Sequence, residues 1–214
     1  MLEALKKTGK PVVSIIMSGR PNTIEKEVNL SDAVLLAFHG GTMAGPALAD
    51  LIFGDEIPSG KLPVTIPKMV GQIPVYYAHK NTGRPAKGMV LLDSIAVGAG
   101  QTSLGNTSYH LDAGDKPLFP FGYGLSYSNF SYSTVKISKT KATMNEKIIV
   151  ECDITNTGKY DAKEVAQLYV RDKVASLARP VRELKGFQKI SLKAGETKNV
   201  KFELSSTDLG FWNT

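Results

Sequence analysis

Acidic side chains are the first candidates for chemistry in this sequence, because Asp and Glu can act as nucleophiles and as general acids or bases. Glu25, Asp55 and Asp112 are three such residues. Only their residue type makes them candidates, and charged side chains are usually solvated on a protein surface. We therefore assign no catalytic residue within the chain.

Other catalytic arrangements have little support. His39, His79 and His110 are far apart and have no carboxylate or cysteine at metal-ligand spacing, which favours structural histidines over a metal site. A nucleophile elbow of the G-x-S-x-G type does not occur. The stretch GAGQTSLG has glycines spaced like those of a phosphate-binding loop, but it lacks the lysine and follows no clear strand. We expect no metal and no cofactor.

The composition indicates a globular protein. The 214 residues are 42% hydrophobic, which suits one large domain or two ordinary ones. The net charge of +6 comes from 26 basic and 20 acidic residues that are interspersed, so we expect no nucleic-acid partner. Apolar runs are too short to span a membrane, and any export signal is expected outside this chain. Cys152, the single cysteine, is expected to be a small core residue.

The first part of the chain has the pattern of an α/β layer. Residues 2–9 indicate the last turns of a helix with a glycine at its end. Apolar runs over 12–17 and 34–38 predict strands that are covered on both faces, as in a parallel sheet. Residues 43–54 predict a helix with proline in its first turn.

Less regular structure is expected after this layer. Prolines interrupt the short apolar run 64–66, which argues against a central strand. Residues 72–115 are polar and glycine-rich and predict a long loop region. The stretch PLFPFGYGLSYSNF, residues 117–130, combines aromatic residues with glycines, which predicts a packed connector rather than a flexible linker.

The remainder of the chain alternates with a period of two. Apolar residues occupy every second position of 148–154 and 166–170, which indicates strands with one buried face. Further strands are expected over 184–192 and 198–204, and a turn over 156–159. This spacing predicts a β-sandwich related to immunoglobulin and fibronectin type III modules. About five strands can be counted where about seven are usual, and both ends of the chain are therefore expected to be cut.

Five stretches occur in an order that resembles one enzyme family: GTMAGPALADLIFGDEIPSGKLPVTIP, QIPVYYAHKNTGRP, PLFPFGYGLSYSNF, ITNTGKYDAKEVAQLYVRD and RPVRELKGFQKISLKAGET. They are similar to the C-terminal part of glycoside hydrolase family 3, in the β-glucosidase and β-xylosidase branch that ends in a fibronectin type III-like domain. The resemblance implies an α/β plus all-β fold. It assigns residues 1–70 to the end of the α/β sandwich domain, 71–122 to long loops and the connector, and 123–214 to a C-terminally truncated fibronectin type III-like β-sandwich.

The resemblance also implies a function. Family members retain anomeric configuration with two carboxyl groups about 5 Å apart. The nucleophile is an aspartate of the barrel domain and the acid/base is a glutamate upstream of the first helix, and neither motif occurs here. We expect the C-terminal portion of a retaining exo-β-glycosidase, foremost a β-glucosidase that acts on β-linked glucosides or oligosaccharides. This segment alone is expected to be inactive, and the parent enzyme to be periplasmic or secreted.

One motif departs from the family pattern. Met43, Ala44 and Gly45 stand where many relatives carry a glutamate followed by two glycines. The loop before Pro46 is therefore not expected to make a charged contact with sugar.

Outer sugar subsites are expected in the loops that follow the α/β layer. The candidates for substrate binding are Tyr76, Tyr77, Arg84 and Tyr109. An aromatic ring can stack on a pyranose face, and polar groups can bind its hydroxyls. The alternative is that these side chains pack the connector or face another domain, which is the commoner role.

A second interpretation makes the chain a stand-alone β-sandwich module that binds carbohydrate or protein. Its aromatic residues are scattered in the sequence, whereas such a module needs an aromatic platform. An exposed coplanar pair of rings would favour this interpretation, and an apolar flank on the α/β layer would favour an enzyme. Two strands and few helices cannot cover a parallel sheet. We therefore expect contact with a polypeptide that carries the barrel and the rest of the α/β sandwich, or self-association through the same flank.

Overall fold

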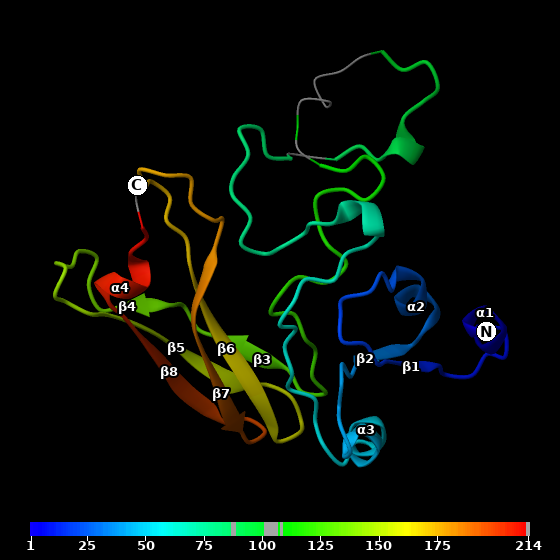
Figure 1. The fold of residues 1–214 in the computed structure, drawn as a ribbon. Helices are drawn as coiled ribbons and strands as arrows, with labels where there is room; N and C mark the ends of the chain where they lie inside the picture. Colours follow the sequence, from blue (N-terminus) through cyan, green and yellow to red (C-terminus); the bar gives the residue numbers. More distant parts are fainter. Residues whose placement is uncertain (87–88, 101–106, 108, 213–214) are drawn as a thin grey trace. The chain divides into compact units, whose positions relative to one another are not determined.

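The computed structural model describes residues 1–86, 89–100, 107 and 109–212 (Figure 1). The chain forms two compact units. Unit 1 comprises Met1–Phe53, Leu62–Tyr77 and Asn81–Phe121, and unit 2 comprises Gly54–Lys61, Ala78–Lys80 and Gly122–Thr214. Each unit therefore draws on segments that are far apart in the sequence. Most of the stretch GAGQTSLG lies outside the described residues.

Unit 1 contains a parallel pair of strands. Strand β1 (Val13–Ile16) pairs with β2 (Ala33–Leu36), and Ile16 stands opposite Leu36. Helix α2 (Glu25–Leu30) connects the two strands. These strands confirm the two that the apolar runs predicted. The expectation that both faces are covered is wrong for β1 in this chain, because Val13 and Ile15 on one face are 46% and 38% exposed.

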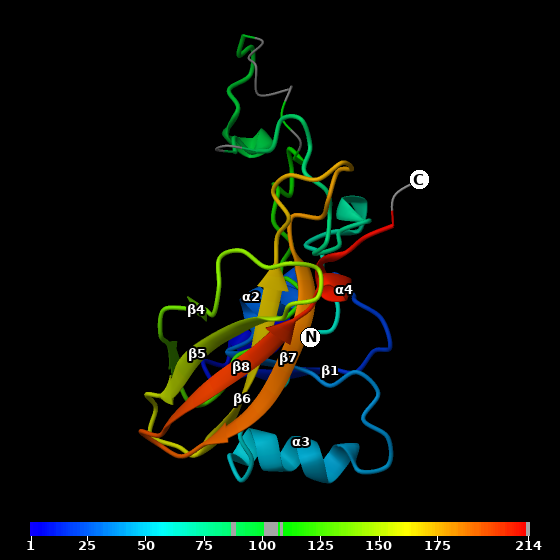
Figure 2. The same ribbon diagram turned by 90° about the vertical axis from the view of Figure 1, so that its left-hand side faces the viewer.

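The other helices of unit 1 flank this pair. Helix α1 (Leu2–Lys6) packs beside α2 and is followed by Gly9, whose φ of 72° lies in the left-handed region that favours glycine. Helix α3 (Ala44–Phe53) lies on the side of the sheet opposite to α2 (Figures 1 and 2). Both helices were predicted, whereas α2 was not, because its six residues are too few to show a period.

Buried apolar side chains from distant segments form the core of unit 1. Ile24 packs with Leu62 and Ile66, and all three are at most 8% exposed. Ile66 also pairs with Phe119 in an isolated β-bridge, which closes this core. The region expected to be loops contains the short 3-10 helices η1 (Val70–Gln72) and η2 (Leu92–Ser94).

Unit 2 is a sandwich of two antiparallel sheets. In one sheet β5 pairs with β3, β4 and β8, and in the other β6 pairs with β7. The bounds are β3 Phe130–Tyr132, β4 Lys136–Ile137, β5 Ile148–Asn156, β6 Ala162–Val170, β7 Glu183–Leu192 and β8 Thr197–Leu204, followed by helix α4 at Ser206–Leu209. Ile154, Ala166, Leu192 and Val200 are at most 2% exposed and form the core between the sheets. The predicted α/β plus all-β fold class is confirmed.

A buried asparagine fixes the predicted turn after β5. Asn156 is fully buried, and its Oδ1 accepts hydrogen bonds from Ser128 Oγ at 2.6 Å and from Gly158 N at 3.1 Å. Its Nδ2 donates to Tyr160 O at 2.8 Å and to Leu192 O at 3.2 Å. All polar capacity of this side chain is thereby used, as a buried amide requires.

The second half of the aromatic and glycine-rich stretch is packed tightly within unit 2. Gly122 O accepts a hydrogen bond from Gln167 Nε2 at 3.0 Å, and Gly124 O accepts one from Lys61 Nζ at 2.9 Å. A Cβ at Gly124 would collide with the carbonyl oxygen of Gly60. Glycine is therefore needed at position 124 because backbone approaches backbone there.

Candidate functional site

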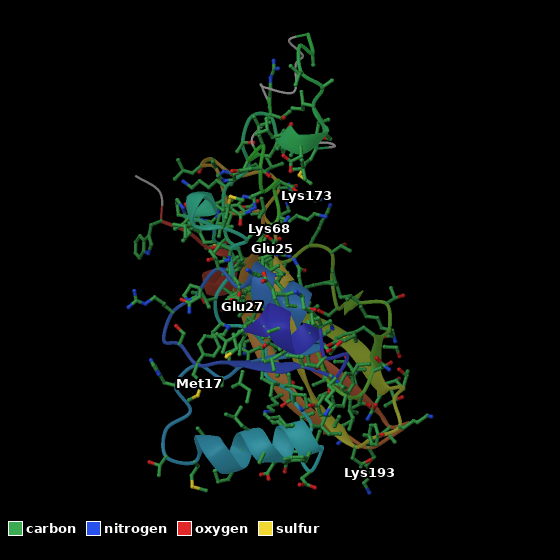
Figure 3. The ribbon with its side chains drawn as sticks, turned by 90° about the vertical axis from the view of Figure 1, so that its right-hand side faces the viewer. Met17, Glu25, Glu27, Lys68, Lys173 and Lys193 are labelled. Atoms are coloured by element: carbon green, nitrogen blue, oxygen red, sulfur yellow. The ribbon has the colours of Figure 1, made fainter. Side chains whose placement is uncertain are left out.

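The carboxyl ends of β1 and β2 lie at one edge of the parallel sheet, which we call the carboxyl edge and define as residues 17–22 and 37–41. Ligands of α/β sheets bind at this edge, because the loops that leave neighbouring parallel strands gather there. Met17, labelled in Figure 3, begins the loop after β1 and is 59% exposed. The carboxyl edge is therefore the candidate functional site of unit 1.

Two exposed ion pairs connect α1 to its neighbours in unit 1. Lys6 Nζ, at the end of α1, lies 2.8 Å from Asp32 Oδ1, and Asp32 Oδ2 accepts a hydrogen bond from Val12 N at 2.9 Å. Glu3, in the first turn of α1, lies 2.8 Å from Lys26 Nζ in the first turn of α2. The hydrogen bond with Lys26 lowers the pKa of the Glu3 carboxyl. Since α2 follows the loop from β1, the N-terminal end of α1 also lies at the carboxyl edge.

A hollow opens at the carboxyl edge. Its lining consists of the apolar residues Ile16, Ile24, Leu36, Phe38 and Ile66 and the polar residues Ser18, Arg20 and Asn22. Ile24 and Ile66 are buried, whereas Arg20 and Asn22 are exposed, so the floor is apolar and the rim is polar. The cavity volume is only about 10 Å³, far below the roughly 300–1,000 Å³ of pockets that enclose a whole small molecule. The hollow is therefore a shallow depression that a ligand could lie across but not enter.

The loops around the hollow hold unusual backbone. Phe38 has a φ of 50°, in the left-handed region that a bulky residue rarely adopts. Strained backbone of this kind gathers at functional sites. The imidazole of the neighbouring His39 lies so close to Gly19 that a Cβ at position 19 would collide with Nε2. The two loops of the carboxyl edge are therefore in direct contact.

Ser18 shapes the loop and leaves the side chain of Arg20 free to bind. The Ser18 hydroxyl donates to Arg20 O at 3.1 Å and accepts from Arg20 N at 3.3 Å. Within the described part of the chain, the guanidinium of Arg20 takes part in no hydrogen bond or ion pair. Sequence reasoning missed Arg20 and Asn22. Their position directly after an apolar run that predicted a parallel strand was the signal that could have found them.

The four side chains predicted to bind sugar all belong to unit 1. Tyr77 stacks on Phe121, with ring centroids 4.2 Å apart and planes 15° apart. Tyr109 donates its hydroxyl to a backbone carbonyl at 3.3 Å. Tyr76 is 60% exposed, and Arg84 is also exposed. Tyr77 and Tyr109 thus support their own loops, and sugar binding by the four residues stays a prediction.

The described carboxylates resemble solvated groups more than a catalytic pair. Glu25, labelled in Figure 3, lies in the first turn of α2, and Asp55 and Asp112 are exposed. Among the described acidic side chains only Glu164 is buried, and there Lys61 pairs with it. The described His, Cys, Asp and Glu residues form no group of three or more that could hold a metal ion.

The outer face of the larger sandwich sheet is polar. Lys201 Nζ lies 3.1 Å from Glu151 Oε2, and Asn199 Nδ2 donates to Asp153 Oδ1 at 2.8 Å. Both pairs join residues that stand opposite each other on β5 and β8. Cross-strand pairs of this kind form a solvated face, which disfavours an aromatic platform on this sheet.

Two family models match parts of the chain. Residues 1–127 match the glycosyl hydrolase family 3 C-terminal domain, and residues 164–214 match a fibronectin type III-like domain. The chain belongs to glycosyl hydrolase family 3. The resemblance seen in the five sequence stretches is thereby confirmed.

Relatives in the family align with the whole chain. A periplasmic β-glucosidase of Salmonella typhimurium is 45% identical over 213 residues, which cover 100% of this chain and 26% of the relative. A β-xylosidase of Formosa agariphila is 42% identical over 213 residues, which cover 100% of this chain and 27% of the relative. The chain thus spans about a quarter of the length of the curated relatives it matches.

Solved family 3 structures share the fold. A β-glucosidase from Listeria innocua in complex with isofagomine superimposes with a TM-score of 0.88 at 40% identity, over 99% of this chain and 28% of that one. A family 3 β-glucosidase from Bifidobacterium adolescentis superimposes with a TM-score of 0.75 at 30% identity, over 99% of this chain and 29% of that one. An α/β layer followed by a β-sandwich therefore also occurs within these longer chains.

Proposed function

We propose that the chain is the C-terminal portion of a retaining exo-β-glycosidase, foremost a β-glucosidase that hydrolyses terminal non-reducing β-D-glucosyl residues. The similarity over the whole chain to β-glucosidases about four times its length carries this proposal. Crystal structures of the Listeria innocua β-glucosidase contain glucose, or laminaribiose in a mutant form. These complexes support β-linked glucosides or oligosaccharides as substrates here.

Retaining hydrolysis takes two carboxyl groups and two displacements. One carboxylate attacks the anomeric carbon while the other carboxyl group protonates the glycosidic oxygen, so the leaving group departs as an alcohol. The second group, now a carboxylate, takes a proton from water, and the water oxygen displaces the first carboxylate from the sugar. We propose that both groups lie outside this chain, which would leave the chain alone inactive.

An exposed apolar face supports a covering partner. Val13 and Ile15 are 46% and 38% exposed, and they alternate along β1 with residues that face the core. Met17, directly after β1, is 59% exposed. Phe53, at the end of α3, is 83% exposed. Apolar patches of this kind mark interaction surfaces. We propose that the barrel and the remaining α/β elements of the enzyme cover this face, with self-association through it as the alternative. This flank favours the enzyme over a stand-alone binding module.

The exposed loop residues are proposed as outer-subsite contacts. Tyr76 and Arg84 have the exposure that a sugar contact requires. Tyr77 and Tyr109, whose rings are held by other contacts, would form the wall behind them. An aromatic ring and a guanidinium are suitable partners for a pyranose face and its hydroxyls.

We propose that the parent enzyme is periplasmic or secreted. Similarity to a periplasmic β-glucosidase supports a periplasmic or secreted enzyme. Within the described residues, the helices are too short or too polar to cross a membrane.

The test uses the natural polypeptide that contains this chain. It should release glucose from p-nitrophenyl β-D-glucoside and from β-linked glucose disaccharides, and NMR should detect β-glucose before mutarotation. The 214 residues alone should release none. Absence of hydrolysis by the intact polypeptide would overturn the proposed function, and hydrolysis by the isolated chain would overturn the external location of the carboxylates.

A further inference from the structure

In the proposed enzyme, the carboxyl edge would lie near the catalytic acid/base carboxyl group. The N-terminal end of α1 lies at this edge, as the ion pair between Glu3 and Lys26 shows. The resemblance implies that the acid/base glutamate lies upstream of α1. The segment that carries it would therefore reach the same edge as Arg20 and Asn22. That glutamate protonates the oxygen between the two halves of the substrate, so groups beside it face the leaving group.

The chemistry of the edge matches a sugar. The guanidinium of Arg20 and the amide of Asn22 offer several N–H donors at the rim of the hollow. Phe38 and the aliphatic lining offer an apolar surface for the C–H groups of a pyranose. A few polar groups around an apolar surface are the usual composition of a small-molecule site.

We propose that Arg20 and Asn22 bind hydroxyl groups of the leaving-group sugar and so favour β-linked disaccharides over simple glucosides. This assignment rests on the proposed function. It adds two residues of the carboxyl edge to the substrate site, in addition to the loop residues Tyr76 and Arg84 that are proposed above.

An anionic ligand fits the edge less well. Arg20 is the only charged residue in the described lining, and Ile24 and Ile66 form an apolar floor beneath it. Burying an anion against apolar surface is costly unless several donors or charges compensate. A neutral hydroxyl group costs less to bury than an anion, and a hydrogen bond accepted from a donor at the rim offsets much of that cost.

The test compares two kinds of substrate in the intact polypeptide. Arg20→Ala, Asn22→Ala and the control Lys10→Ala are assayed with p-nitrophenyl β-D-glucoside and with the β-linked glucose disaccharide that the wild type hydrolyses best. Lys10 is an exposed cation before β1, at the opposite edge of the sheet. For Arg20→Ala, the ratio of kcat/KM for the disaccharide to kcat/KM for the aryl glucoside should fall about tenfold or more. Losing a hydrogen bond to a charged group weakens binding by about this factor. Asn22→Ala should lower the same ratio by a smaller factor, and Lys10→Ala should leave it unchanged.

The outcomes separate the two proposals. An active wild type and an unchanged ratio in both Arg20→Ala and Asn22→Ala would overturn the sugar assignment alone. A wild type that hydrolyses neither substrate would overturn the proposed function and this assignment together. Thermal melting of each variant distinguishes misfolding from lost binding. If Arg20→Ala lowers the melting temperature, Arg20→Lys provides the second test, since it keeps the charge and removes the planar donor group.

Discussion

Lys61 Nζ lies 3.2 Å from Glu164 Oε2 inside unit 2, where the two side chains are only 17% and 8% exposed. Glu164 Oε1 accepts a hydrogen bond from Tyr132 Oη at 2.9 Å, whereas Oε2 accepts none within the described structure. The charge of Lys61 therefore compensates this buried oxygen. Lys61 also donates to Gly124 O at 2.9 Å. One ammonium group thus joins the segment 54–61 to the sandwich.

Removing this ammonium should destabilise unit 2. Lys61→Met leaves the Glu164 carboxylate buried without a partner, which costs about 3–5 kcal/mol of unfolding free energy. The control is Lys147→Met, because Lys147 pairs with Glu203 in an exposed bridge whose side chains are 66% and 61% exposed. That change should cost less than about 1 kcal/mol. Urea unfolding followed by circular dichroism measures the loss of unfolding free energy in each variant. Equal losses for the two variants would contradict the role of Lys61.

Tyr132 should make the stability of unit 2 sensitive to alkali. Burial raises the pKa of the Tyr132 phenol, and the neighbouring Glu164 carboxylate raises it further. The phenol of an unfolded chain has a pKa of about 10. Because the folded state holds the phenolic proton more tightly, this contribution to stability is fully present below about pH 10 and is lost as the pH rises towards the folded pKa.

The measurement compares wild type with Tyr132→Phe. The difference in unfolding free energy between them should be constant from pH 7 to about pH 9 and should shrink above about pH 10. Denaturant unfolding curves of both proteins at a series of pH values measure this difference. A difference that stays constant up to pH 11 would show that the phenol titrates normally in the folded protein.

Gly124 should not tolerate a side chain. A Cβ there would collide with Gly60 O and would lie 3.1 Å from Lys61 Cδ, and the colliding atom belongs to backbone that cannot rotate away. Gly124→Ala should therefore cost about 1–3 kcal/mol of unfolding free energy. Gly60→Ala is the matched control, since a Cβ at Gly60 would meet no atom within 4 Å. Similar thermal melting of the two variants would show that the connector can shift.

Much of the fold could be predicted because the burial pattern is local. In β5, Val150 and Ile154 are buried, and alternation with exposed neighbours reveals such a strand without knowledge of its partners. Helix α2 escaped prediction because it has six residues and packs through few of them, such as Val28. The connector was recognised because aromatic residues and glycines together are unusual in helices and strands.

The candidate site was less predictable because it depends on contacts between distant segments. Tyr77 was singled out for its chemistry, but its stacking on Phe121 follows from the folding of the loops that separate them. Arg20 was overlooked because its setting depends on the pairing of β1 with β2 and on the left-handed backbone of Phe38. No local sequence motif predicts the stacking of Tyr77 or the setting of Arg20.

The exposed face of β1 should respond to charge in the intact polypeptide. If another part of the enzyme covers it, Ile15→Glu buries a carboxylate and should cost more than about 2 kcal/mol of unfolding free energy. Ile149→Glu is the control, because Ile149 has the same 38% exposure but stands on the polar outer face of β5. The control should cost less than about 1 kcal/mol. Equally small losses in calorimetry would argue that the β1 face is open to solvent in the intact polypeptide.

Glu146 should titrate at unusually low pH. Its carboxylate accepts hydrogen bonds from Lys139 Nζ at 2.6 Å, Thr143 N at 2.8 Å and Thr143 Oγ1 at 3.0 Å. The bond from Lys139, followed by those from Thr143, lowers the pKa of Glu146 to about 2. An unfolded Glu has a pKa of about 4.3. The stabilisation from Glu146 is therefore present above about pH 4.3 and is lost as the pH falls towards 2.

Carboxyl carbon shifts in an NMR titration measure this pKa directly. Lys139→Ala should raise the pKa of Glu146 towards its ordinary value, because the bond from the lysine is the largest cause of the shift. Lys141→Ala removes a nearby exposed cation that makes no such bond, so it should leave the pKa of Glu146 almost unchanged. The comparison separates a specific hydrogen bond from general positive charge. Equal shifts in both variants would favour general charge, since Lys141 makes no hydrogen bond to Glu146 and could act only through longer-range attraction.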